Sequence, residues 1–193
     1  LRYNAFMRHV ISALVMNEPG VLANVAGMFA ARGFNIDSLV VGRTENPELS
    51  RMTIVVTGDD ATLDQVRKQL AKLVPVVKVT DFKGVAYVER DLVLLTVGAG
   101  PGQRSDVVEI VNLFRGRIVD VGPESLMIEL AGTEDKLVAF TELMKPFGVL
   151  ELARTGVIAM ARGMQPARRS AVDTGKKRTR SADAPAGEAL PPS

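Results

Sequence analysis

The apolar residues of this chain change their spacing in a fixed order, and that order limits the possible folds more than any single motif does. Residues 8–16 form a run of apolar, strand-favouring side chains that ends at the turn Asn17-Glu18-Pro19-Gly20. A helical period follows, at Val21, Leu22, Val25, Met28 and Phe29. Since Gly33 ends this stretch, the pattern predicts a strand, a tight turn and one short amphipathic helix.

Three further strands and a second helix complete the first unit. The strands are predicted over residues 34–42, 52–57 and 76–82, because these segments are apolar or alternate in a period of two. Thr62 and Gln65 match a capping box at the start of a helical stripe over residues 63–73, and Pro75 ends that helix. The resulting order β-α-β-β-α-β is the split βαβ arrangement of a ferredoxin-like fold.

The same order returns in the second half of the chain. The pattern predicts a strand over residues 92–97, helices over 107–114 and 137–144, and strands near Arg117, Leu126 and Val149. We therefore predict the α+β class, with two ferredoxin-like βαββαβ modules over residues 7–83 and 84–163. Modules of this size bury only about 60% of their unfolded surface, so each is expected to pack against its twin or a second chain.

The predicted first helix carries small residues on the side away from its apolar stripe. They are Ala23, Ala26, Gly27, Ala30 and Ala31. Because small side chains let another backbone approach closely, this face favours oligomerisation through the helix.

Charge and composition restrict the class of partner. Residues 165–193 hold six Lys or Arg against three Asp or Glu, and since the whole chain is formally +2, the preceding residues are near −1. A folded part without a broad basic face is poorly suited to nucleic acid. The composition after Gly163 predicts a disordered tail over residues 164–193, whose basic run at 176–180 could attract phosphate or an acidic partner.

Cysteine is absent, and no apolar run approaches the ~20 residues that span a bilayer. The chain is therefore expected in a reducing compartment, most simply the cytoplasm, with an organelle interior as the alternative for a eukaryotic source. Because the first patterned segment opens at Met7, we expect Leu1 to Phe6 to be a remnant of expression or processing, with a cleaved transit peptide as the alternative.

Few residues could catalyse a reaction. His9 is the only histidine and lies in a predicted strand, so we expect a structural role. The acidic pairs Asp59-Asp60 and Glu134-Asp135 stand where loops enter helices, and carboxylates there complement the helix dipole. The glycine-rich loop at 98–102 has Gln103 in place of the last small residue of a dinucleotide fingerprint, so a plain turn is favoured over nucleotide binding. We predict no catalytic residue and no metal site.

The first turn is the more informative candidate. Residues 17–22 place backbone N–H groups at a helix N-terminus, and Gly20 permits close approach, so an amino-acid carboxylate could bind there. After the helix, the amide of Asn35 could accept from an ammonium and donate to a carboxylate. From these residues alone, a simple turn and a helix stop are favoured over a binding site.

The turn resembles the signature of the ACT domain family, small-molecule sensors with this βαββαβ fold that pair through their first helices and sheets. More narrowly, four ordered motifs resemble the small regulatory subunits of acetolactate synthase, also called acetohydroxyacid synthase. They are NEPGVL at 17–22, RGFNIDSL at 32–39, LSRMT at 49–53 and FRGRIVDV at 114–121. The resemblance runs from about Met7 to Arg162 and so covers both modules.

This resemblance implies a subunit without catalytic machinery that stimulates a catalytic large subunit and confers feedback inhibition on it in branched-chain amino-acid biosynthesis. In the family, valine lies between two ACT domains of a homodimer. Carried over, the effector site is formed by Asn17, Gly20, Val21 and Leu22 of one protomer and by Asn35 and Ile36 of its partner. Thiamine diphosphate, Mg and FAD would belong to the large subunit, and no cofactor is expected on this chain.

Other functions remain open. One is a stand-alone ACT-type sensor for another enzyme or for transcription, and others are an RNA-binding module or an enzyme. RNA-recognition domains stack bases on aromatic residues, whereas the predicted third strand offers Met52, Ile54 and Val56. The second module lacks the Asn-x-Pro-Gly turn, so no second valine site is expected. Valine, leucine and isoleucine differ by about one methylene, worth only ~1–3 kcal/mol, so the sequence does not rank them.

Overall fold

The computed structural model describes residues 7–163. The expectations of a remnant at residues 1–6 and of a disordered, basic tail at 164–193 lie outside the described residues. Within residues 7–163, no helix is long and apolar enough to cross a membrane.

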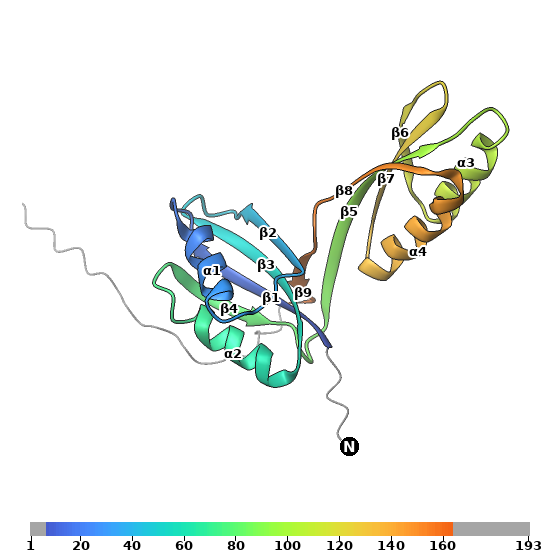
Figure 1. Cartoon of the computed structure of the whole chain (residues 1–193). Helices are drawn as coiled ribbons and strands as arrows, with labels where there is room; N and C mark the ends of the chain where they lie inside the picture. The colour runs from blue at the N-terminus through green and yellow to red at the C-terminus, as the bar shows by residue number, and fades with distance from the viewer. Residues whose placement is uncertain (1–6, 164–193) are drawn as a thin grey trace, which may run out of the picture.

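The first module has the predicted element order. Its elements are β1 (Met7–Met16), α1 (Val21–Ala30), β2 (Ser38–Arg43), β3 (Leu49–Gly58), α2 (Asp60–Leu70) and β4 (Val76–Asp81). The strands form an antiparallel sheet in the order β2-β3-β1-β4, and both helices cover one face (Figure 1). Ile11, Ala13 and Val15 point from β1 into the core beneath the helices and are fully buried.

The second module repeats this architecture. Its elements are β5 (Tyr87–Gly98), α3 (Arg104–Leu113), β6 (Arg117–Val121), β7 (Ser125–Gly132), α4 (Glu134–Met144), a short 3-10 helix η1 (Lys145–Phe147) and β8 (Val149–Arg154). Its sheet order, β6-β7-β5-β8, is the counterpart of that in the first module. The α+β class with two βαββαβ modules is therefore confirmed.

A ninth strand, β9 (Ile158–Ala161), was not predicted from the sequence. It pairs antiparallel with the start of β5, at Tyr87 to Arg90 (Figure 1). Its buried side packs against the face of the first sheet that is opposite the helices. The buried residues of this inter-module cluster are Val10, Val55, Phe82, Val157 and Ala159. The two modules are thus joined by an apolar contact as well as by the chain.

Two predicted starts were wrong, each for a local reason. The second strand begins at Ser38 instead of Phe34, because Gly33 is left-handed with φ 66° and the Phe34 N–H bonds back to the Phe29 carbonyl over 3.1 Å. Helix α2 begins at Asp60, since the cap is Asp59 and not the predicted capping box; Asp59 Oδ1 accepts from the Thr62 N–H at 2.8 Å.

Candidate functional site

The turn before α1 is fixed to the loop between β2 and β3 by Asn17. Its backbone N–H donates to the Glu48 carbonyl over 2.8 Å. Its side-chain Nδ2 donates to the Pro47 carbonyl over 3.0 Å, and its Oδ1 accepts from the Ser50 hydroxyl over 3.1 Å. Asn17 therefore positions the turn, and Ser50, which was not among the predicted site residues, positions Asn17. The only signal for Ser50 was its place in the LSRMT motif.

The N-terminus of α1 is open to an anion. Gly20 is the N-cap, with φ 82°, and a Cβ there would meet no atom within 4 Å. Helix α1 has no side-chain cap and no acidic residue in its first turn, whereas the other three α-helices of residues 7–163 each carry an acidic residue there. Val21 is buried beneath the helix and Leu22 is 47% exposed. The partial positive charge of this helix end is therefore available to an outside carboxylate.

The loop after α1 presents Asn35 to solvent. Asn35 Nδ2 donates to Asp37 Oδ1 over 2.8 Å, and the other carboxylate oxygen of Asp37 accepts from Thr57 Oγ1 over 2.8 Å. Ile36 is half-buried and packs against the core of the first module, which anchors the loop. Asp37 was missed as a site residue, although the Asn-x-Asp spacing is typical of local side-chain hydrogen bonding.

One copy of the chain does not bring the six predicted site residues together. Asn17 and Gly20 precede α1 and Asn35 follows it, and a helix of 10 residues is about 15 Å long. The small face of α1 is exposed along this length, at Ala23, Ala26, Gly27, Ala30 and Ala31. Two such faces packed about a twofold axis would place the start of one α1 beside the end of the other.

The second module has no equivalent of the turn amide. Its backbone bond from Ala99 N–H to the Glu124 carbonyl, at 2.8 Å, matches the bond from Asn17 to Glu48, so the fully buried Ala99 stands where the first module has Asn17. Arg104 Nε donates to the Ala99 carbonyl over 3.0 Å, and its guanidinium also bonds the Gly122 and Pro123 carbonyls. The glycine-rich loop is thus tied by a side chain of its own module, as a structural turn would be.

The other sequence candidates have structural partners. His9 is 7% exposed and its Nε2 lies 3.1 Å from the Gly58 carbonyl. The carboxylate of Asp60 lies 2.5 Å from Lys83 Nζ. Among residues 7–163, no group of three or more His, Asp or Glu is arranged to hold a metal ion.

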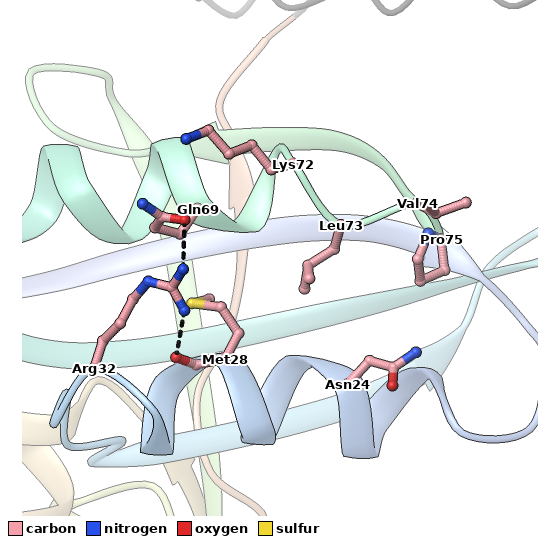
Figure 2. A pocket seen from close by; sticks show the side chains of 8 residues that line it. All are labelled: Asn24, Met28, Arg32, Gln69, Lys72, Leu73, Val74 and Pro75. Atoms are coloured by element: carbon pink, nitrogen blue, oxygen red, sulfur yellow. Dashed lines mark hydrogen bonds between the residues drawn. The ribbon is translucent and has the colours of Figure 1, made fainter.

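A hollow of about 550 Å³ lies between α1 and the end of α2 with the segment that follows it, and the sequence did not predict it (Figure 2). Arg32 crosses the hollow, donating from Nη2 to Gln69 Oε1 over 2.9 Å and from Nη1 to the Met28 carbonyl over 3.4 Å. These bonds tie the end of α1 to α2. The loop that carries Asn35 is therefore held before Asn35 by the bond from Arg32 to α2 and after it by the bond from Thr57 to Asp37.

Comparisons with known proteins cover both modules. Residues 11–78 match a family model described as the AHAS small subunit-like ACT domain, and residues 90–163 match one described as the small subunit of acetolactate synthase. The chain is 55% identical over 157 residues to a probable acetolactate synthase small subunit of Archaeoglobus fulgidus, covering 81% of this chain and 98% of that protein. It is 51% identical over 156 residues to the probable counterpart of Methanothermobacter thermautotrophicus, covering 80% and 93%. A crystal structure of the acetolactate synthase small subunit from Thermotoga maritima has 44% identity and a TM-score of 0.75, and covers 81% of this chain and 98% of that one.

Proposed function

This chain belongs to the family of acetolactate synthase small subunits, and we propose that it binds valine, or another branched-chain amino acid, between the ACT modules of two copies. The resemblance drawn from the four sequence motifs is confirmed by both family models and by the relatives. The protein is thus a small regulatory subunit in branched-chain amino acid biosynthesis.

The proposed partner is a catalytic large subunit of acetolactate synthase. The small subunit stimulates that enzyme and makes it sensitive to the effector. Thiamine diphosphate, Mg and FAD would be bound by the large subunit, where pyruvate condensation takes place. In this proposal the small subunit contributes only binding and conformational energy.

The effector carboxylate is proposed to bind the first-turn N–H groups of α1, at Gly20, Val21 and Leu22. The observation that carries this proposal is that α1 has no side-chain cap and no acidic residue in its first turn. Exposed Leu22 offers apolar contact to a branched side chain, and the Asn35 amide of the second copy can accept from the ammonium. Because the two groups lie at opposite ends of a helix about 15 Å long, the site requires a dimer paired through the small face of α1.

Calorimetric titration of the full chain with valine tests this site. We expect binding to the unmodified chain and at least tenfold weaker binding to Asn35→His, because a ring would replace the small amide at the interface. Asn112→His, at an exposed position of α3, is the matched control and should bind valine normally. Equal affinity of the two variants would argue against the assigned site.

Acetolactate formation by the large subunit of the same organism tests the regulatory role. Added small subunit should raise the rate and make it sensitive to valine. Valine binding without any effect on this enzyme would favour a stand-alone ACT-type sensor instead.

A further inference from the structure

A short segment of the second module, residues 155–157, touches the first module directly beside the proposed effector loop. The N–H of Val157 donates to Ser38 Oγ over 3.2 Å, and Ser38 is three residues after Asn35. Gly156 has φ 86°, and a Cβ there would lie 2.7 Å from Ser38 Oγ and 2.8 Å from Val40 Cγ2. A larger residue at position 156 would have to displace these two side-chain atoms or the segment itself.

The same segment is tied to the second module by a buried carboxylate. Asp91 in β5 is 2% exposed, and its Oδ1 accepts from the Gly156 N–H and from Thr155 Oγ1, each over 3.1 Å. Its Oδ2 accepts from Arg154 Nε over 2.9 Å. A buried carboxylate that loses such partners is costly, so residues 155–157 are expected to move with β5 as one unit.

Hydrogen bonds lead from the effector loop to this contact. Asn35 Nδ2 donates to Asp37 Oδ1, and the Asp37 N–H donates to the Val55 carbonyl over 2.9 Å. Asp37 is the residue immediately before Ser38, where β2 begins. A ligand ammonium that donates to Asn35 Oδ1 pulls on the same amide whose Nδ2 is bonded to Asp37, and so acts on the residue next to Ser38. Because Gly156 leaves no space at this point, a shift of Ser38 is passed on to the segment.

We propose that Ser38 and Gly156 are positioning residues that transmit effector occupancy from the first module to the second. This inference rests on the proposed function, since it concerns how the same effector site regulates the large subunit. Transmission requires that the contact has different energies in the bound and free states. The variants that disturb the contact should therefore separate effector binding from inhibition.

Gly156→Ala and Ser38→Ala test the inference in the reconstituted enzyme with the full chain. We expect each variant to bind valine within about threefold of the unmodified affinity in the absence of the large subunit. The valine concentration that half-inhibits the enzyme should rise at least tenfold, because occupancy no longer reaches the second module. Gly148→Ala is the matched control: its φ is 81° and a Cβ there meets nothing within 4 Å, so it has the backbone strain without the contact.

The outcomes separate this inference from the proposed function. Unchanged half-inhibition in Ser38→Ala and Gly156→Ala would overturn the inference alone. An equal rise in Gly148→Ala would also overturn it, because backbone strain would then be the cause. Absence of valine binding to the unmodified chain would overturn the proposed function and this inference with it. Ser38→Ala, which removes only a hydroxyl, decides the question where Gly156→Ala does not fold.

Discussion

The Nε of Arg8, in β1, lies 2.7 Å from the carboxylate oxygen Oε2 of Glu134, the first residue of α4. The same guanidinium donates from Nη1 to Glu89 Oε2 over 3.0 Å. Burial by itself would lower the pKa of Arg8, but the hydrogen bond to Glu89 and the charges of both carboxylates outweigh it and raise the pKa. One cation of the first module is thus held by two anions of the second.

Arg8→Ala should weaken the attachment of the two modules. Hydrogen bonds to charged groups contribute about 1.5–3 kcal/mol each, and the partial exposure of these side chains reduces that, so we expect a loss of about 1–2 kcal/mol in the free energy of unfolding. Arg8→Lys should lose less, because it keeps the charge. Urea denaturation measures the loss, with exposed Arg117→Ala as control. A loss no larger than the control's would show that the bridge is energetically neutral.

Gly20→Ala should weaken effector binding more than it weakens the fold. Gly20 and Gly84 both have positive φ, and a Cβ at either position meets nothing within 4 Å. Each alanine therefore costs about 1 kcal/mol of backbone strain. Only Gly20 lies at the proposed carboxylate site, so calorimetry should give at least tenfold weaker valine binding for Gly20→Ala and unchanged binding for Gly84→Ala. Similar valine affinities of the two variants would mean that the valine carboxylate does not bind at Gly20.

The elements with a clear hydrophobic period could be predicted, and their ends could not. The helical stripe of α2 identifies that helix because it buries one face. The alternation of Met52, Ile54 and Val56 identifies β3, although Val55 on the opposite face is buried as well. The predicted start of β2 was wrong because Phe34 packs against a helix residue and is not part of the strand. Its ring lies edge-on to that of Phe29, with 6.3 Å between the ring centroids. That contact closes the end of α1, and a period of two cannot distinguish it from a strand residue.

The site could be predicted only as a set of residues. Motif resemblance indicated Asn17 and Asn35. The partner of Asn17, Ser50, lies 33 residues away and depends on which loops meet in space, whereas Asp37 lies only two residues after Asn35 and was a local signal that was overlooked. The assignment of these residues to an effector site, and the division of the modules at residues 83 and 84, stay predictions. The hydrogen bond between Val157 and Ser38 joins residues that are 119 positions apart, and no local sequence pattern predicts such a contact.

Strand β9 was missed because both of its faces are apolar. Val157 and Ala159 are buried against the first sheet, while Ile158 and Met160 are 54% and 66% exposed. An apolar run without alternation gives no period of two, so pairing with β5 could not be predicted.

Ala159→Asp should therefore destabilise the protein far more than Met160→Asp. Ala159 is 2% exposed, so its replacement buries an unpaired carboxylate, whereas the neighbouring change places one in solvent. We expect a loss of at least about 3 kcal/mol for Ala159→Asp and within about 0.5 kcal/mol for Met160→Asp. Chemical denaturation compares the two directly. Equal stability of these variants would mean that β9 does not pack on the first sheet in solution.

Tyr87 should titrate at higher pH than an exposed tyrosine. Burial, and then the charge of Glu89, raise its pKa above the usual value of about 10. The folded state therefore holds the phenolic proton more tightly than the unfolded state. The stabilisation from this group is complete below pH 10 and is lost as the pH rises from about 10 through the folded pKa.

In Tyr3→Phe, Tyr87 is the only tyrosine, so tyrosinate absorbance reports it alone, and the urea-denatured chain serves as reference. Adding Glu89→Gln should move the pKa back towards 10. A folded Tyr87 that titrates together with the denatured reference would contradict the packing of its ring against Phe82, at 4.9 Å between centroids.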